Sequence, residues 1–252
     1  MQKINFFQKF KKTFDPHLEN KTNKIIEGKG LKKVYRVGSG HIHALAGIDL
    51  QVERGEFCAV VGTSGSGKST LLNMLAGLEK LSKGDLKIAG YSLNEMSEDQ
   101  LVQFRRDHIG FIFQSFNLIP TMTAWENVAL PLMFRGVPVQ ERRKRAIAML
   151  KQVGLTKHIE HRPQQMSGGQ QQRVGIARAL VVDPEIVFAD EPTGNLDSKT
   201  GAEILQLIKK ISKEQNQTLL MVTHDDHLAQ YADRIIQISD GTIIDIREGS
   251  LR

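Results

Sequence analysis

The apolar residues of the chain occur in two kinds of pattern, short unbroken runs and helical spacing. These patterns predict strands that alternate with helices. Unbroken apolar runs at 57–61, 186–189 and 219–222 are typical of strands that a parallel sheet buries on both faces. Residues 199–214 instead show helical spacing, with an inward face of Ile204, Leu207, Ile208 and Ile211. The alternation predicts an α/β fold.

Shorter patterns predict further strands near both ends of the chain. Three are expected in the N-terminal part, over 25–35, 48–52 and 86–90. Near the C-terminus, Asp240-Gly241 separates the runs 235–238 and 242–244, and this spacing predicts a hairpin.

Residues 92–165 have a pattern of their own, which predicts a mostly helical insertion within one domain over 25–252. The segments 97–100 and 123–126 both have the spacing of a capping box at a helix start. A further helix is expected between Pro138 and Gly154.

The composition is that of a soluble chain with a substantial core. Apolar residues make up 40% of the 252 residues. No run approaches the roughly 20 apolar residues of a membrane-spanning helix, and the N-terminus lacks an apolar signal core, so we expect a cytoplasmic location. Cys58, the single cysteine, is expected in the core and excludes an internal disulfide.

The net charge of +6 belongs to the beginning of the chain. Residues 1–33 contain nine lysines and three acidic residues, whereas the other 219 residues contain 25 basic and 25 acidic groups. A neutral body argues against a nucleic-acid surface. Within a basic extension over 1–24, residues 1–14 show apolar side chains at helical spacing, which fits both a helix on an anionic membrane face and a solvated tail.

A glycine-rich segment between the run at 57–61 and a helical pattern at 71–76 is the strongest chemical signal. Gly62, four residues, and then Gly67-Lys68-Ser69 is the spacing of a phosphate-binding loop. Its glycines let several backbone N–H groups point at one phosphate, and the helix start adds its positive end. The sequence therefore predicts a nucleoside triphosphate site, formed by Gly62, Thr63, Ser64, Gly65, Ser66, Gly67, Lys68, Ser69 and Thr70.

Polar residues at the ends of apolar runs supply candidates for hydrolysis. Asp190 ends one run, a position from which a carboxylate can hold Mg²⁺, and Glu191 follows it as a candidate general base. Gln114 and His224 follow two other runs, where they would approach the metal, the water or the ligand. Taken singly, both are also compatible with structural roles.

A second glycine-rich helix start lies at Ser167-Gly168-Gly169-Gln170. Ser167 and Gln170 have capping-box spacing, so the two glycines fall in the first helical turn and leave an anion site bare of side chains. One triphosphate loop and one separate anion-binding helix end suggest two chains that clasp nucleotide between them.

The order of these motifs resembles the ABC (ATP-binding cassette) ATPase family over roughly residues 25–245. The shared motifs are the phosphate loop, Gln114, Ser167 to Gln170, Asp190-Glu191, Asn195 to Asp197 and His224. The resemblance implies a P-loop NTPase fold with a RecA-like core, an antiparallel β subdomain and an inserted α-helical subdomain. Met166 stands where the family most often has leucine, and we expect little effect because both are apolar and unbranched at Cβ.

The resemblance also implies roles for single residues. Tyr35 would stack on the adenine of ATP, and residues 62–70 would bind the phosphates. Mg²⁺ would be surrounded by Ser69, Gln114 and Asp190.

The same resemblance implies catalytic and dimer roles. Glu191 would be the catalytic base, and His224 would sense the γ-phosphate. Residues 167–170 would touch that phosphate across a homodimer, and Asp197 would belong to the loop that links the two sites.

Two segments, 126–132 and 188–197, are similar to the lipoprotein-release and macrolide-export type of ABC ATPase. In that group a cytoplasmic ATPase on the inner face of the membrane drives a permease subunit, which exports or extracts lipoproteins, peptides or drugs. The alternative is an ATPase of a non-transporting membrane complex that regulates cell-wall remodelling at division. The soluble DNA-repair and translation ATPases need a second cassette, a long coiled coil or a metal-binding hook, and the sequence has none of these.

Overall fold

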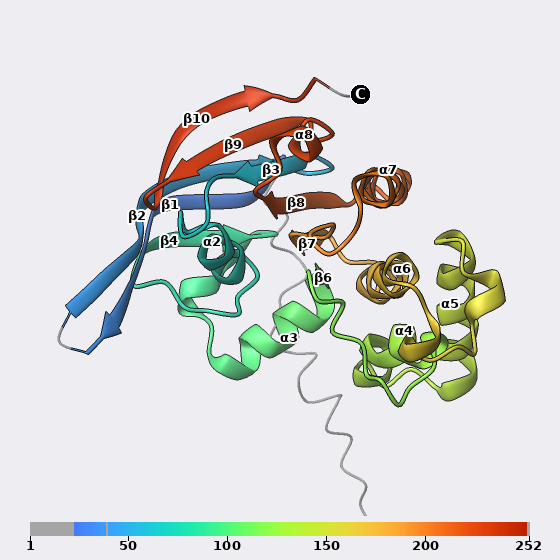
Figure 1. Cartoon of the computed structure of the whole chain (residues 1–252). Coiled ribbons are helices and arrows are strands. Elements are labelled where there is room, and N and C mark those ends of the chain that lie inside the picture. Colours follow the sequence, from blue (N-terminus) through green and yellow to red (C-terminus); the bar gives the residue numbers. More distant parts are fainter. Residues whose placement is uncertain (1–22, 39, 251–252) are drawn as a thin grey trace, which may run out of the picture.

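The computed structural model describes residues 23–38 and 40–250. Its strands form two sheets (Figure 1). A six-stranded sheet has the order β10-β9-β3-β8-β7-β6, and a four-stranded sheet has the order β2-β1-β4-β5. The strands are β1 (Lys24–Val37), β2 (Gly40–Glu53), β3 (Phe57–Val61), β4 (Lys83–Ile88), β5 (Tyr91–Ser92), β6 (Ile109–Ile112), β7 (Ile186–Asp190), β8 (Thr218–Thr223), β9 (Arg234–Ser239) and β10 (Thr242–Glu248).

The six-stranded sheet positions the candidate site. Strands β9, β3, β8, β7 and β6 pair in parallel, so their carboxyl ends meet at one edge of the sheet. Strand β10 pairs antiparallel with β9 and forms the edge of the sheet opposite β6. The two strands are joined by the hairpin predicted at Asp240-Gly241, where both residues have positive φ. The predicted apolar runs are therefore confirmed as central strands buried on both faces.

The two faces of this sheet belong to two different cores. On β3, Cys58 and Val60 pack with the four-stranded sheet and with α2 (Lys68–Leu75) and α3 (Glu98–His108), whereas Ala59 and Val61 pack with the helices on the other face. This alternation follows from the two-residue period of a strand. Burial of the Cys58 thiol raises its pKa to about 12, in agreement with the expected core position.

The second face is covered by helices that follow the phosphate loop in sequence (Figure 1). They are α4 (Ala124–Phe134), α5 (Val139–Gln152), α6 (Gly168–Leu180), α7 (Ser198–Glu214) and α8 (Asp226–Ala229). Short 3₁₀ turns lie at η1 (Leu93–Glu95), η2 (Thr156–His158) and η3 (Pro163–Gln165). On α7 the buried face is rotated relative to the prediction, because Leu205 is fully buried while Leu207 is only half-buried.

The segment expected to be a mostly helical insertion, 92–165, contains one strand of the main sheet. β6 pairs in parallel with β7, and α3 before it packs in the core between the two sheets. Residues 109–112 form a strand because they pair with β7, which lies far along the chain. A four-residue apolar run inside a helical pattern does not predict such a strand. From Ala124 to Gln165 the described elements are only helices and 3₁₀ turns, joined by loops. The division into subdomains stays a prediction.

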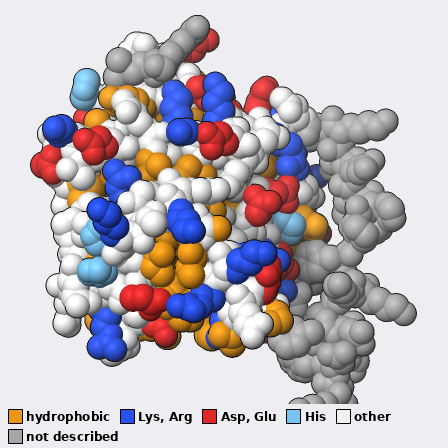
Figure 2. Space-filling view, turned by 90° about the vertical axis from the view of Figure 1, so that its right-hand side faces the viewer, with side chains coloured by type: hydrophobic (Ala, Val, Ile, Leu, Met, Phe, Trp, Pro, Cys, Tyr) orange, Lys and Arg blue, Asp and Glu red, His pale blue; other side chains and the backbone are white. Residues whose placement is uncertain are grey.

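The basic extension expected over 1–24 lies almost entirely outside the described residues. Among the described helices, none has both the length and the apolar character needed to cross a membrane. On the face drawn in Figure 2, basic and acidic side chains are interspersed, and hydrophobic side chains gather near the middle.

Candidate active site

The glycine-rich loop between β3 and α2 has the backbone that its sequence predicts. Gly67, the N-cap of α2, has φ of +100°, and a Cβ there would clash with the carbonyl oxygen of Ala44. A Cβ on Gly62 would likewise clash with the carbonyl oxygen of Ile238. The loop therefore needs glycine at both positions. Because Gly67 has no side chain to cap α2, the first N–H groups of this helix face the loop without a side-chain cap from that residue.

Lys68 lies inside the loop. Its ammonium Nζ donates to the carbonyl oxygens of Gly62 and Thr63, both at 2.8 Å, and the residue is only 6% exposed. Burial lowers the pKa of Lys68, while the nearby Glu191 and Asp190 act in the opposite direction. Both of these hydrogen bonds go to neutral carbonyls, so an anionic ligand in the loop would supply a further partner for the charge of the buried ammonium.

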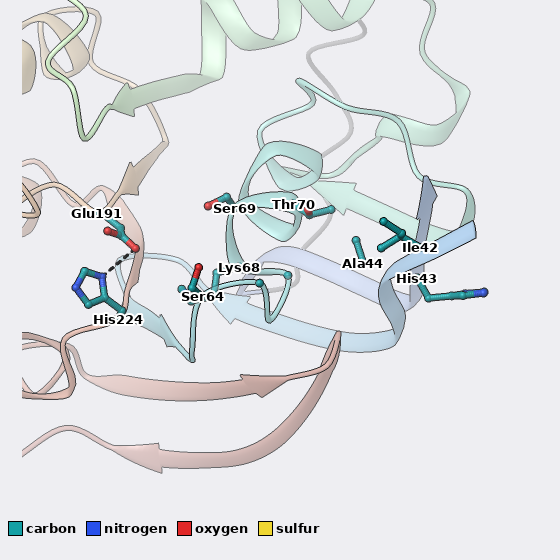
Figure 3. Close-up of a pocket in the computed structure, with 11 residues that line it drawn as sticks. Ile42, His43, Ala44, Ser64, Lys68, Ser69, Thr70, Glu191 and His224 are labelled. Carbon is teal, nitrogen blue, oxygen red and sulfur yellow. Dashed lines mark ion pairs between the residues drawn. The ribbon is translucent and has the colours of Figure 1, made fainter. Parts of the chain in front are cut away.

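A cavity of about 570 Å³ opens above this loop (Figure 3). Predicted residues from three separate parts of the chain line it, namely Ser64, Gly65, Gly67, Lys68, Ser69, Thr70, Glu191 and His224. The first six belong to the phosphate loop, and the last two follow β7 and β8. The cavity therefore combines an anion-binding loop with a carboxylate and an imidazole.

Glu191 is held at the cavity wall through both carboxylate oxygens. Its Oε1 lies 3.1 Å from Nδ1 of His224, and its Oε2 accepts a hydrogen bond of 3.3 Å from Nε2 of Gln114 (Figure 3 draws the first contact). Gln114, two residues after β6, and His224, directly after β8, thus meet at the residue that follows β7. A carboxylate oriented in this way can accept a proton from a water in the cavity.

Asp190 and Ser69 form a pair of hard oxygen ligands. The Ser69 hydroxyl lies 3.5 Å from Oδ1 of Asp190. Burial and then the charge of Glu191 raise the pKa of Asp190, while Ser69 and Lys68 act in the opposite direction. A cation between these oxygens would favour the ionised carboxylate, so the pair fits Mg²⁺. The amide of Gln114 is directed at Glu191, so its predicted metal contact stays a prediction.

The second glycine-rich helix start does not line this cavity. Ser167 caps α6 with the predicted box, because its Oγ accepts from the Gln170 N–H at 3.3 Å and the Gln170 Oε1 accepts from the Ser167 N–H at 3.0 Å. A Cβ on Gly169 would lie 2.9 Å from Thr200 at the start of α7. Within one chain, residues 167–170 therefore lie beside α7 and away from the phosphate loop.

Asp197 acts as the N-cap of α7. Its carboxylate accepts a hydrogen bond of 3.0 Å from the Thr200 N–H. The Thr200 side chain first, and then this N–H, lower the pKa of Asp197. The residue is exposed and lies beside the start of α6. The structure brings Asp197 near the second glycine-rich segment, and its role between two sites stays a prediction.

Tyr35 is close to the cavity but does not line it. Its hydroxyl donates to Glu79 at 2.5 Å, and the Lys33 ammonium lies 5.0 Å from its ring centroid. Burial and the Glu79 carboxylate raise the pKa of Tyr35. The cavity wall on this side is formed by Ile42, which lies opposite Tyr35 in the β1–β2 register.

Three lining residues were missed by sequence reasoning, namely Ile42, His43 and Ala44 of β2. Figure 3 shows Ile42 and Ala44 on the side of Thr70, while the His43 ring points away from it. The predicted role of Tyr35 points to this side of the cavity. Its neighbours on β2 follow only from the register of β1 against β2, which the sequence does not give.

Comparison with known sequences and structures gives concordant matches. The sequence profile of the ABC transporter family matches residues 45–194. The chain is 48% identical over 232 residues to an uncharacterized ABC transporter ATP-binding protein of Methanocaldococcus jannaschii, covering 90% of this chain and 98% of that one. The structure of an ATP-binding cassette dimer in a post-hydrolysis state, bound to ADP and Pi, superposes with a TM-score of 0.83 and 45% identity. The match covers 89% of this chain and 99% of that one.

A second kind of relative is longer than this chain. The macrolide export ATP-binding/permease protein MacB of Wolinella succinogenes is 46% identical over 228 residues. The match covers 90% of this chain, and the chain spans only 35% of that relative.

Proposed function

The chain belongs to the ABC transporter family and carries its ATPase domain, and from this we propose that it is the ATP-hydrolysing subunit of a bacterial membrane complex of the export type. The observation that carries the hydrolytic part is the Glu191 carboxylate, held by Gln114 and His224 on the wall of the cavity that contains Lys68. Binding groups for a triphosphate and a proton acceptor for water thus share one cavity.

In the proposed reaction the chain binds the phosphates with the Lys68 ammonium and the N–H groups at the start of α2. Glu191 accepts a proton from the water that attacks the γ-phosphorus, while the bond from that phosphorus to the bridging oxygen breaks. His224 and Gln114 hold the carboxylate in place. Mg²⁺, held by Ser69 and Asp190, would supply positive charge at the phosphate oxygens.

We propose further that two copies of the chain form the working unit. Residues 167–170 would contact the γ-phosphate bound by the other copy, because this helix start is bare of side chains and lies away from its own chain's cavity. The dimeric cassette bound to ADP and Pi supports this arrangement by similarity. ATP would then favour the closed pair through contacts that ADP lacks.

The proposed membrane partner is a separate permease subunit. The relatives named MacB combine ATP-binding and permease functions in one chain, and this chain matches about a third of their length. A permease on another chain would supply the rest, with this subunit on the cytoplasmic side. Lipoproteins, peptides or drugs are the proposed substrate classes, and co-purification of a permease from the native membrane tests the pairing.

Glu191→Gln tests the hydrolytic proposal. An amide cannot accept the proton, so turnover should fall by about 10²–10⁴-fold while ATP binding remains. Size-exclusion chromatography should then show an ATP-dependent dimer. Lys68→Ala is the control, because it should bind no nucleotide and stay monomeric with ATP. A Glu191→Gln variant that hydrolyses ATP at the normal rate would refute the assignment of the base.

A further inference from the structure

Gln172 is a fully buried polar residue on α6, one turn beyond the two glycines. Its amide Nε2 donates a hydrogen bond of 2.6 Å to the carbonyl oxygen of Pro192. Its Oε1 has no hydrogen-bond partner within the described part of the chain. Buried polar atoms are normally hydrogen-bonded, so a buried glutamine whose Oε1 lacks a partner calls for an explanation in terms of the bond that its Nε2 makes.

The peptide that Gln172 holds directly follows the proposed base. Glu191 has φ of +41°, which is uncommon for a residue with a side chain, and it also precedes a proline, which restricts its backbone further. Such a conformation persists only where the surroundings hold it. The strain lies at the residue whose carboxylate must face the cavity.

The main-chain groups of Glu191 and Pro192 take part in three hydrogen bonds. The Glu191 N–H donates to Val222 of β8 at 3.0 Å, and the Gly194 N–H donates to the Glu191 carbonyl at 3.0 Å. The first belongs to the sheet edge and the second is internal to the turn. The bond from Gln172 to Pro192 connects the turn to α6.

α6 carries two groups of interest within one turn of each other. Its first residues are the proposed contact to the nucleotide of the other copy. Gln172 donates a hydrogen bond to Pro192, which follows the proposed general base Glu191 of the same chain. The helix between them is regular and its start is capped by the Ser167–Gln170 box. A shift of the helix start therefore moves the Gln172 amide with it.

We propose that Gln172 is a positioning residue, whose amide holds the Glu191–Pro192 turn so that the Glu191 carboxylate faces the water and follows the position of α6. This inference rests on the proposed function. Nucleotide binding at one composite site would then change the position of the Glu191 carboxylate in the other. The change would pass through the hydrogen bond from Gln172 to Pro192 in the chain that contributes to both sites.

Gln172→Met tests the inference, because methionine has a similar length and is apolar but lacks the donor. We expect kcat to fall about tenfold or more, while KM and the affinity for ADP stay within about threefold of the wild type. Gln171→Met is the matched control on the same helix, since Gln171 donates to the Met166 carbonyl at 3.1 Å and is only half-buried. This control should retain wild-type kcat.

Two further measurements separate positioning from general loss of structure. Amide hydrogen exchange should speed up in a peptide over 190–196 in Gln172→Met but not in one over 62–70. In a Glu191→Gln background, Gln172→Met should add little to the loss of turnover, because its effect passes through Glu191. Gln172→Leu is also apolar and also lacks the donor, so it should give the same selective loss of kcat as Gln172→Met.

An unchanged kcat in Gln172→Met, or an equal loss of ADP affinity and kcat, overturns the inference. If the wild-type chain itself lacks ATPase activity, the proposed function fails first. If the wild type is active and the variant equally so, only the role of Gln172 is refuted.

Discussion

Glu79 links two parts of the candidate site that lie on different elements. Its carboxylate accepts from the Tyr35 hydroxyl on β1 and from the Asn73 amide of α2 at 3.2 Å, and it lies 3.2 Å from the Lys33 ammonium. Burial raises the pKa of Glu79, but the hydrogen bonds from Tyr35, Lys33 and Asn73 lower it more strongly, so the carboxylate is held ionised. The Tyr35 ring is thereby fixed relative to the helix whose start carries the phosphate loop.

Glu79→Ala should therefore weaken ATP binding by about tenfold, which corresponds to about 1.4 kcal/mol, if Tyr35 stacks on the base. Binding of inorganic tripolyphosphate should stay unchanged, because it has no base. Calorimetric titration of both ligands measures the difference. Glu98→Ala is the control, since Glu98 pairs with the neighbouring Lys80 at 2.8 Å on the exposed surface. Equal losses for both ligands would contradict the stacking role of Tyr35.

At the scale of elements, the helices differ in how they begin. α3, α4 and α6 all start with a complete capping box, whereas α2 starts at a glycine without a side-chain cap. The capped starts satisfy their own N–H groups in part. The start of α2 leaves its first N–H groups free of such a cap, so they can face an anion held by the phosphate loop.

The boxes on α4 and α6 provide a matched pair for a test. Thr123→Ala and Ser167→Ala should each lower the free energy of unfolding by about 0.5–2 kcal/mol, because each removes a cap. Only Ser167→Ala should also weaken the ATP-dependent dimer formed in a Glu191→Gln background. Urea unfolding and size-exclusion chromatography measure the two effects. Equal dimer formation in both variants would argue against residues 167–170 as the contact across the dimer.

At the scale of the whole molecule, one polar cluster ties distant segments together at the end of the sheet away from the cavity. Glu185, just before β7, lies 2.6 Å from Nδ1 of His108 at the end of α3 and 2.7 Å from Arg54 after β2. The His108 hydrogen bond is the main cause that lowers the pKa of Glu185 to about 2, burial opposes it, and Arg54 assists.

The cluster predicts a loss of stability in acid. Because the folded-state pKa of Glu185 is below its unfolded value of 4.5, its contribution is complete above about pH 4.5 and disappears as the pH falls toward 2. Glu185→Gln should therefore flatten the decline of the free energy of unfolding over this window, as measured by urea unfolding at several pH values. Arg54→Met should flatten it less than His108→Leu. A wild-type slope in Glu185→Gln would refute the assignment.

Much of the fold follows from local patterns. The buried strands, the hairpin at Asp240-Gly241 and the capping boxes depend on residues within a few positions of each other. The phosphate loop is of the same kind, because its strand, its glycines and its helix start are consecutive. The backbone of these features was predicted correctly for that reason, while phosphate binding by the loop stays a prediction.

The remaining features depend on contacts between distant segments. The register of β1 against β2 decides that Ile42 lines the cavity while Tyr35 bonds to Glu79, and the pairing of β6 with β7 places a strand inside a stretch with a helical pattern. The approach of α6 to the turn after β7 buries Gln172 on Pro192.

The sequence by itself determined which chemical groups the chain carries and the local backbone that presents them, since both are set by neighbours along the chain. Only the tertiary structure decided which of these groups meet. It joined Glu191, Gln114 and His224, and it kept residues 167–170 away from their own cavity. The physical reason is that sheet order, register and helix packing are set by burial of the whole core, which no single segment specifies.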